Sequence, residues 1–432
     1  MDHDFGAFSS ADDLRRATCA RGVRLMSPGA CILTINGGSS SIKFAVYRMD
    51  GDQPRKRLRG KIDRIGLQGT HFTFDDPTRK QQGNRGIGEL DHRSATDFLL
   101  DWLAEQIGLS SIAAVGHRVV NGGARYREPH QITQEVLREL RRVSAYAPEH
   151  LPSEINMIEL VDQRMPGLPQ VACFDTEFHR DMPRVAKTLA IPRRFAAKGV
   201  ERYGFHGLSY EFLMEELERL AGAEAAKGRV ILCHLGNGSS LAAVRDGKSV
   251  DTSMGFTPAA GLPMSTRSGD LDPGLGWYLA QTEQMTAQQF HQMVNQDSGL
   301  LGVSETSSDL RDLLGREASD VRAAEAVELF CYQVRKWIGA FAAALGGLDT
   351  LVFSGGIGEN APAIRARICE GLGFLDVQLD ENRNAAGETV ISADQGRVQV
   401  RVIRTDEDVI IAKAVFGLLA RAETVQHAHP EE

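Results

Sequence analysis

The chain of 432 residues has few cysteines, no excess of positive charge and no long hydrophobic run. Its six cysteines form no CxxC pair, which argues against a zinc cluster or a dense disulfide framework and favours a reducing, cytoplasmic setting. Lysine and arginine number 49 against 57 aspartates and glutamates, and the net charge of −8 disfavours nucleic acid as the main partner. The most apolar stretch, Trp337 to Leu348, is shorter than the ~20 residues that span a bilayer, so we expect no membrane helix.

The N-terminus also lacks the cationic start and apolar run of a signal peptide. We interpret residues 1–29 as an extension that is expected to be disordered, with Met26 as a candidate second start. Hydrophobic residues make up 42% of the chain and charged residues 25%, a balance typical of a packed globular protein. The length predicts two domains.

An internal repeat on the scale of a domain is visible in the sequence. The apolar run Cys31–Ile35 breaks into a turn rich in Gly and Ser, and alternation of apolar and polar residues resumes at Ile42. Much further along, Val230–Cys233 leads into a second Gly-Ser turn, and alternation resumes at Leu241. Two similar halves are the simplest interpretation.

A third strand with a glycine turn lies near the C-terminal end. Thr350–Phe353 leads into a glycine-rich turn at 354–360, and Pro362 then begins a helical stretch that ends at Glu370. Before this strand, apolar residues recur at helical spacing from Val327 to Leu345, and Gly346 ends that helix. The order of helix, strand, turn and helix predicts an α/β layer.

Glycine turns after strands suit phosphate, because a chain without Cβ atoms can approach closely and aim its N–H groups at anionic oxygens. None of the three turns has the Walker or the dinucleotide pattern. In the first turn, Asn36, Ser39 and Ser41 offer short polar groups, and Lys43 on the same strand face would place an ammonium beside phosphates. The alternative is an ordinary β-turn followed by a solvated lysine.

Four polar residues outside these turns are candidates for a site. Arg118 precedes a glycine pair and Arg267 lies in a dense polar loop, where a guanidinium can bind a carboxylate or phosphoryl group through two hydrogen bonds. Asp175 follows an apolar strand, and His206 stands between Phe205 and a glycine. The alternatives are structural ion pairs for the arginines, a helix N-cap for Asp175 and a buried core histidine for His206.

Three further segments receive plainer interpretations. Residues 405–408 end a strand in three carboxylates, which could meet Mg²⁺ or cap a helix from Val409 to Leu419. The polar segment 68–88 predicts a hairpin or surface loop with little chemistry. The basic run 55–61 is interpreted as a solvated strand face.

These patterns occur in the order typical of the acetokinase family, which the chain resembles from about residue 30 to 420 within the superfamily of acetate and sugar kinases, Hsp70 and actin. The motifs are Asn36–Lys43, His117–Gly123, Phe174–His179, Tyr203–Gly207, His234–Ser240, Met254–Gly261, Thr266–Pro273, Gly356–Asn360 and Thr405–Glu407. The resemblance implies an α/β, two-domain, duplicated ribonuclease-H-like (actin-like ATPase) fold with an interdomain cleft. Domain I is expected at 30–180 plus 409–432 and domain II at 181–408.

The resemblance also implies an activity, which is the reversible, ATP-dependent phosphorylation of acetate to acetyl phosphate by direct in-line transfer. Propionate or another short-chain carboxylate is the alternative acceptor, and a nucleotide-driven sensor or binding module is the more distant alternative. ATP or ADP would act as co-substrate with Mg²⁺, or Mn²⁺, as the metal. A homodimer is expected.

Site residues carry over from the family by motif position. The catalytic residues would be Asp175, His206, Arg267 and Arg118. The carboxylate pocket would contain Arg118, Val120, Phe205 and Pro258. The phosphates and nucleotide would contact Lys43, Ser39, Ser41, His234, Leu235, Gly236, Asn237, Gly238, Asp309, Leu310, Arg311, Gly356, Ile357, Gly358, Glu359 and Asn360. The metal would contact Asn36 and Glu407.

The acceptor chemistry and several departures from the family pattern refine this assignment. A carboxylic acid with a pKa of roughly 4 to 5 is already ionised at pH 7, so Asp175 is not needed chiefly as a base. Glu149 stands where the family commonly has leucine, Ala124 replaces a glutamate, and residues 208–210 differ from the usual Thr-Ser-His, while Glu407 is kept. Either Glu149 points away from the acyl pocket, or the pocket admits an acid more polar than acetate.

Overall fold

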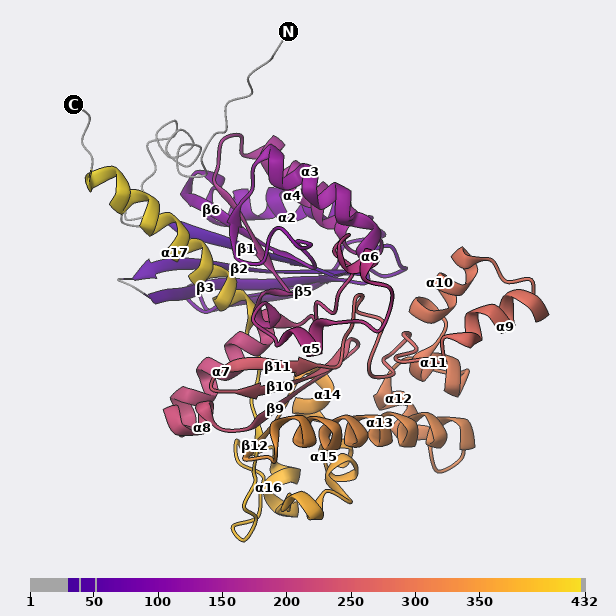
Figure 1. Cartoon of the computed structure of the whole chain (residues 1–432). Helices are drawn as coiled ribbons and strands as arrows, with labels where there is room; N and C mark the ends of the chain where they lie inside the picture. Colours follow the sequence, from indigo (N-terminus) through magenta and orange to yellow (C-terminus); the bar gives the residue numbers. More distant parts are fainter. Residues whose placement is uncertain (1–29, 39, 51–52, 429–432) are drawn as a thin grey trace. The chain divides into compact units, whose positions relative to one another are not determined.

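The computed structural model describes residues 30–38, 40–50 and 53–428. Within these ranges the chain divides into two compact units (Figure 1). The first unit ends at Glu177 and resumes at Asp406, and the second unit is Phe178–Thr405. The sequence analysis predicted the two domain boundaries after residues 180 and 408. The predicted extension at 1–29 lies outside the described residues.

The first unit is built on a sheet with the strand order β5-β4-β3-β2-β1-β6-β8-β7. Its strands are β1 Cys31–Gly37, β2 Ser41–Asp50, β3 Gln53–Asp63, β4 His71–Asp76, β5 Gln81–Gly86, β6 Ile112–Val119, β7 His130–Gln131 and β8 Gln170–Phe174. Its helices are α2 His92–Ile107, η1 Leu109–Ser111, α3 Gln134–Val143, η2 Ser144–Tyr146, α4 Leu151–Arg164 and α17 Glu407–Ala428. The short helix η3, Glu177–His179, spans the boundary with the second unit.

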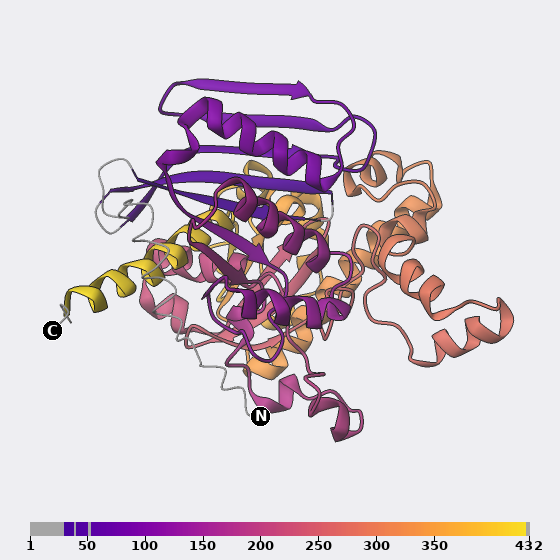
Figure 2. The same ribbon diagram turned by 90° about the horizontal axis from the view of Figure 1, so that it is seen from above.

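Helices cover both faces of this sheet (Figure 2). On one face α2 packs through Trp102, whose ring meets those of Phe44 and Phe72 edge-on at centroid distances of 5.7 and 4.9 Å. On the other face α17 contacts β1 and β6. A Cβ atom added to Gly116 of β6 would lie 2.4 Å from a methyl group of Ile411. Glycine at this position therefore lets α17 approach the strand closely.

The second unit holds a sheet with the order β11-β10-β9-β12-β13. Its strands are β9 Val230–Leu235, β10 Ser239–Arg245, β11 Lys248–Thr252, β12 Thr350–Ser354 and β13 Gln399–Val402. Its helices are α5 Arg184–Lys187, α6 Arg193–Ala196, α7 Gly207–Ala221, α8 Ala223–Lys227, α9 Gly274–Thr282, α10 Ala287–Gln296, α11 Gly299–Ser304, α12 Leu310–Arg316, α13 Val321–Leu345, α14 Gly355–Asn360, α15 Pro362–Cys369, η4 Gly373–Leu375 and α16 Glu381–Ala386. No helix in the described part of the chain is long and apolar enough to cross a membrane.

The sheet of the second unit repeats the centre of the first. Strand β9 is antiparallel to β10 and parallel to β12, just as β1 is antiparallel to β2 and parallel to β6. Strands β13 and β8 extend the parallel part of each sheet. This matching topology confirms the internal repeat and the duplicated α/β fold.

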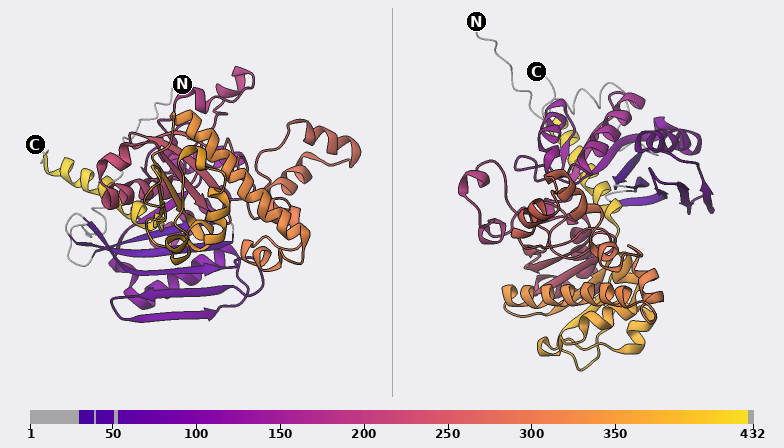
Figure 3. Two further views of the ribbon diagram at one scale, coloured as in Figure 1. Left: turned by 90° about the horizontal axis from the view of Figure 1, so that it is seen from below. Right: turned by 90° about the vertical axis from the view of Figure 1, so that its right-hand side faces the viewer.

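Alternating side chains of β9 serve two hydrophobic cores. Val230 and Leu232 pack in the core that contains α7, whereas Ile231 and Cys233 pack in the core that contains α13. Figure 3 shows α13 as a long orange helix in both views. A strand buried on both faces reads as a continuous apolar run, as this one does in the sequence.

Several local predictions are confirmed and others are corrected. Helix α13 ends at Gly346, whose φ of 74° is left-handed, and segment 68–88 contains the β4–β5 hairpin. The prediction of a turn at 354–360 is wrong, because the residues from Gly355 onward form the short helix α14 directly after β12. Arg118 lies inside β6, one residue before its end. The helix predicted at Val409–Leu419 already begins at Glu407.

Candidate active site

The predicted site residues form one set in each unit. The first unit carries Asn36, Ser41, Lys43, Arg118, Val120, Asp175 and Glu407, and Ser39 lies outside the described residues. The second unit carries His206, Phe205, Pro258, Arg267, the turn His234–Gly238, the segment Asp309–Arg311 and helix α14. In each set, hydrogen bonds connect some of these residues directly to one another.

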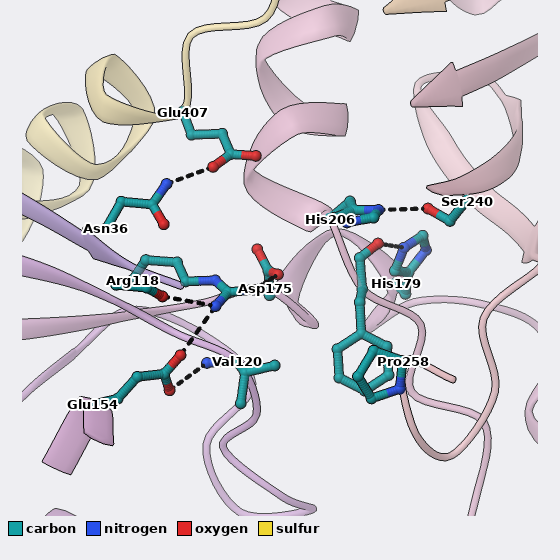
Figure 4. A network of polar contacts seen from close by, with 12 residues as sticks. Asn36, Arg118, Val120, Glu154, Asp175, His179, His206, Ser240, Pro258 and Glu407 are labelled. Carbon is teal, nitrogen blue, oxygen red and sulfur yellow. Dashed lines mark hydrogen bonds and ion pairs between the residues drawn. The ribbon is translucent and has the colours of Figure 1, made fainter. Parts of the chain in front are cut away.

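Arg118 is the centre of the set in the first unit (Figure 4). Its Nη2 donates to Asp175 Oδ2 at 2.6 Å, and its Nη1 donates to Glu154 Oε1 at 3.0 Å and to the carbonyl of Gly37 at 3.2 Å. The parallel pairing of β6 with β8 brings Asp175 here, since its backbone N–H donates to the Val119 carbonyl at 2.9 Å. Burial opposes the charge of Arg118, but Asp175 and Glu154 outweigh it and raise the guanidinium pKa.

Glu154 was missed by the sequence analysis. Its Oε2 accepts from the backbone N–H of Val120 at 3.0 Å, and its side chain is only 4% exposed. Burial raises the pKa of Glu154 to about 7, although Arg118 works against this rise. A signal was available, because Glu154 shares a buried face of α4 with Leu151 and Ile158, where a carboxylate is unexpected.

Asn36 and Glu407 meet near the start of α17. Asn36 ends the apolar part of β1 opposite Lys43 of β2, and its Nδ2 donates to Glu407 Oε2 at 2.5 Å (Figure 4). Asp408 accepts from Thr34 Oγ1 at 3.1 Å, and burial together with Asp406 raises the pKa of Asp408 to about 6. The sequence alternatives for 405–408, a metal site or a helix start, are therefore compatible, since Glu407 is also the first residue of α17.

This pair suits a magnesium ion that is held only partly by protein. No group of three or more His, Cys, Asp or Glu side chains within the described residues could hold a metal. Mg²⁺ commonly takes one or two protein oxygens and completes its shell with water and substrate phosphates. Glu407 could supply a carboxylate oxygen and Asn36 its amide oxygen, and the hydrogen bond from Asn36 Nδ2 keeps these two side chains side by side.

His206 is the centre of the set in the second unit. It precedes α7 with a φ of 61°, a left-handed conformation that is strained for a residue other than glycine. Its Nδ1 lies 2.8 Å from Ser240 Oγ of β10 (Figure 4). The centroid of its ring lies 4.4 Å from that of His234. A Cβ atom at Gly238 would lie 3.3 Å from His206 Nε2 and 3.6 Å from Arg267 Nη1. The side chains of His206 and Arg267 therefore meet the backbone of Gly238, which carries no Cβ atom. This combination of donors and accessible backbone suits an anion.

His179 fixes the backbone that precedes His206. It is buried, with Nδ1 at 2.8 Å from Ser249 Oγ and Nε2 at 3.1 Å from the carbonyl of Phe205. Burial lowers the pKa of His179 to about 4, so the ring is neutral at pH 7. A neutral ring facing a carbonyl must donate from Nε2, which leaves Nδ1 to accept from the Ser249 hydroxyl. His179 thus positions Phe205, a predicted pocket residue.

Arg267 lies in a loop that backbone hydrogen bonds hold in place. Its Nη1 donates to the carbonyl of Pro258 at 3.1 Å, which connects two predicted site residues. Ser265 N–H donates to the carbonyl of Asn237 at 3.2 Å, and Ser298 N–H donates to that of Thr266 at 3.0 Å. The loop is therefore linked to the predicted phosphate turn.

The two glycine turns of the second unit pack against each other. Gly355 has a φ of 76°, and a Cβ atom there would lie 2.5 Å from the carbonyl oxygen of Leu235. The backbone N–H donor of Gly355 bonds Glu359 Oε1 at 3.0 Å, and Thr405 N–H bonds the same oxygen at 3.3 Å. The carboxylate of Glu359, predicted to contact nucleotide, thus also supports the fold at this turn.

Three other predicted nucleotide contacts have clear structural tasks. Asp309 caps α12 by accepting from Arg311 N–H at 2.9 Å, and the side chain of Arg311 is 88% exposed. Leu310 and Leu235 are buried in the core that contains α13. Their side chains serve packing, which leaves their backbone atoms as the candidates for ligand contact.

A cavity of about 650 Å³ in the second unit contains none of the predicted site residues. Its lining is mostly apolar and includes Ser268 beside Arg267, together with Asp297, Lys336 and Trp337. The polar convergence around Gly238, rather than this cavity, has the groups that phosphate chemistry requires.

Comparison with known proteins identifies the family of the chain. The sequence model of the acetokinase family matches residues 31–413. An acetate kinase of Rhodopseudomonas palustris is 43% identical over 90% of this chain and 98% of its own length, and a propionate kinase of Citrobacter rodentium is 43% identical over 91% and 98%. Among solved structures, a propionate kinase from Francisella tularensis has a TM-score of 0.82 at 35% identity and covers 89% of this chain and 98% of its own. The acetate kinase of Porphyromonas gingivalis has a TM-score of 0.79 at 35% identity and covers 90% and 100%.

Both the sequence match and the structural match extend over most of the chain and nearly the full length of these relatives. The internal repeat and both sets of site residues fall within the matched range. The chain therefore belongs to the acetokinase family, whose members are ATP-dependent kinases of short-chain carboxylates.

Proposed function

We propose that this protein phosphorylates acetate with ATP to form acetyl phosphate and ADP, and that propionate is its second candidate acceptor. The convergence of His206 and Arg267 on the bare backbone of Gly238 is the observation that carries the proposal. An acetate kinase and a propionate kinase share the same percentage of identical residues with this chain, so identity does not choose between the two acids. The choice of acetate rests on the apolar pocket residues Val120 and Phe205. Both of these side chains are buried and suit a small acyl group.

The main obstacle to the reaction is electrostatic. The acceptor carboxylate is ionised at pH 7 and needs no base, but it must approach a γ-phosphoryl group that also carries negative charge. Preorganised donors aimed at the phosphoryl oxygens lower this repulsion most where charge develops in the transition state. We assign this task to Arg267 and His206, while Arg118 binds the acceptor carboxylate.

Asp175 has a role other than proton removal in this scheme. Its carboxylate is 2% exposed and receives the 2.6 Å hydrogen bond from Arg118 Nη2. A carboxylate held in this way orients the guanidinium, and the ion pair disfavours its acting as a base. We propose that Asp175 sets the direction in which Arg118 meets the acceptor.

The metal and the nucleotide complete the proposal. Asn36 and Glu407 would hold Mg²⁺, which would neutralise part of the phosphate charge when bound. Lys43 and Ser41 would meet phosphates, and the turn His234–Gly238 with α14 would meet the nucleotide. A nucleotide-driven sensor needs no carboxylate pocket, so Arg118 and Val120 favour the kinase over that alternative.

The family resemblance also supports the proposal that the protein is a homodimer. Light scattering coupled to gel filtration measures this directly. A mass near that of one 47.2 kDa chain would contradict it.

The test of the proposed function is an assay with Mg²⁺ and ATP that traps acyl phosphate as a hydroxamate. Acetate, propionate, butyrate and glycolate are compared at equal concentrations. Fast turnover with acetate or propionate is the expected result, and it would mean that the half-buried Glu149 does not select a polar acid. Activity with glycolate alone would make Glu149 a specificity residue. Absence of acyl phosphate with every acid would contradict the proposal.

A further inference from the structure

Glu154 bridges two of the proposed acceptor-binding residues. Its Oε1 accepts from the Arg118 guanidinium and its Oε2 accepts from the Val120 backbone N–H, each at 3.0 Å (Figure 4). Helix α4 delivers this carboxylate from its first turn, among buried apolar side chains. A carboxylate belonging to the protein therefore already occupies donors that an acceptor carboxylate would use.

Arg118 already pairs with two buried carboxylates. One guanidinium faces two carboxylates, Glu154 and Asp175, and both are at most 4% exposed. An arriving acceptor would place a third carboxylate beside the same cation. Two carboxylates that share one site disfavour each other's charge, so one of the carboxylates that meet at Arg118 is expected to take up a proton when the acceptor binds beside Glu154.

Glu154 is better placed than Asp175 to change its charge. Burial raises the pKa of Glu154 to about 7, and Asp175 adds to this rise, whereas Arg118 opposes it. His117 on the same strand is buried against Gln170 and its pKa is lowered to about 4, so it stays neutral. The charged groups that act on Glu154 are Arg118 of β6 and Asp175 after β8, and Glu407 of α17 acts on Arg118. The nearest histidines along the chain are His117 in β6 and His150 directly before α4.

We propose that Glu154 is an acceptor-positioning residue that neutralises Arg118 in the empty site and takes up a proton when the acceptor carboxylate binds. This inference rests on the proposed function, because it assumes that Arg118 receives the acceptor. The proton comes from solvent and binds Oε1, which releases Arg118 Nη1 to the acceptor. Oε2 keeps its bond from Val120 N–H, and the new O–H can donate to the acceptor oxygen. When the product leaves, the proton returns to solvent and the ion pair re-forms.

The distinctive consequence is a Michaelis constant for the acceptor that depends on pH. Acetate is ionised throughout the range from pH 6 to 8.5, so its own titration contributes nothing there. Above the pKa of Glu154, each further pH unit should raise the KM for acetate by up to tenfold, because a proton must be supplied with every acceptor bound. A merely structural role of Glu154 would not produce this split between KM and kcat.

The experiment measures kcat and the acceptor KM at half-unit steps from pH 6.0 to 8.5, with Mg²⁺ and ATP saturating and acyl phosphate trapped after quenching. Three forms are compared, namely wild type, Glu154→Gln and Glu159→Gln. Glutamine keeps the size and the oxygen acceptor of Glu154 but cannot titrate. Glu159 lies on the same helix, is half-buried and pairs with Arg141 rather than with Arg118, so its variant is the matched control. We expect the KM of wild type and of the control to rise above pH 7, and the KM of Glu154→Gln to be flat within about twofold.

Wild type alone can overturn the inference, even if Glu154→Gln fails to fold. An acceptor KM that stays level from pH 6.0 to 8.5 while acyl phosphate is formed would overturn it and leave the proposed function standing. A rise that persists unchanged in Glu154→Gln would assign the proton to another group and overturn it as well. Absence of acyl phosphate from wild type would remove the proposed function and this inference together.

Discussion

The two sets of site residues differ in the contacts that hold them in place. In the first unit Arg118 is held between Glu154 and Asp175, and Asn36 is bonded to Glu407, so cation and donor both meet acids. In the second unit Arg267 donates to a backbone carbonyl, and His206 bonds a serine hydroxyl, both of which are neutral. An acceptor or a cation that binds in the first unit would therefore replace existing partners. In the second unit Arg267 and His206 converge on the backbone of Gly238, where we propose that the phosphoryl group binds.

Removal of the charge in the second unit should have the largest effect. We expect Arg267→Ala to lower kcat by more than ~100-fold, as does loss of one preorganised donor to a developing anion. Steady-state assay of acyl phosphate formation measures this loss. Arg322→Ala, at the exposed start of α13, is the control and should retain activity. Near-normal turnover of a folded Arg267→Ala protein would remove Arg267 from the site.

Replacing a glycine with alanine should destabilise the second unit at Gly355 more than the first unit at Gly37. Gly355→Ala should lower the free energy of unfolding by about 2–4 kcal/mol, because its φ is left-handed and the new Cβ would meet the Leu235 carbonyl oxygen at 2.5 Å. Gly37→Ala in the first unit should cost less, since its new Cβ would meet the flexible end of Met157 at 2.9 Å. Denaturant unfolding measures both, with the open position Gly373→Ala as control. Equal losses at Gly355 and Gly37 would contradict this ranking.

The pair of Asn36 and Glu407 in the first unit should govern the metal requirement. We expect Glu407→Gln to raise the Mg²⁺ concentration for half-maximal activity by ~10- to 100-fold, because an anionic oxygen ligand becomes neutral. Titration of activity with Mg²⁺ at saturating ATP measures the shift. Glu381→Gln, in the exposed first turn of α16, is the matched control. An unchanged requirement in Glu407→Gln would argue against a metal at this pair.

Lowering the pH should change the stability of the two units in opposite directions, through His179 in the second unit and Glu154 in the first. In the folded protein the pKa of His179 is about 4, so its ring is neutral, whereas in the unfolded chain its pKa is near 6.5. Below pH 6.5 the unfolded chain therefore binds more protons, and the free energy of unfolding decreases as the pH is lowered. Glu154 has a folded pKa of about 7, above its unfolded value, so its contribution instead rises as pH falls from 7 to 5. Each change amounts to about 1–2 kcal/mol.

Hydrogen exchange of β9 and β6 at pH 7 and pH 5 measures this contrast. Relative to wild type, His179→Gln should protect β9 better at pH 5, and Glu154→Gln should protect β6 less well. The same sign of change in both variants would contradict the assignment of opposite charge states to the two residues.

Much of the fold was predictable from local pattern. The apolar runs at Cys31 and Val230, the alternation that follows each, and the glycine that ends α13 all record backbone conformation and burial within a few residues. The short helix α14 was missed, because glycine at Gly355 and Gly356 disfavours a helix in isolation. Close packing against the Leu235 carbonyl overrides that preference.

The sequence by itself determined the duplicated sheet, the three glycine segments and the family, because motif order and periodicity are local properties that survive without contacts. Only the tertiary structure decided the charge state of the site. Asn36 and Glu407 are 371 residues apart, and Arg118 and Asp175 are 57 apart, yet each pair is bonded. Burial and distance set the partners of Glu154 and the proton on His179, and neither quantity can be read from residue order.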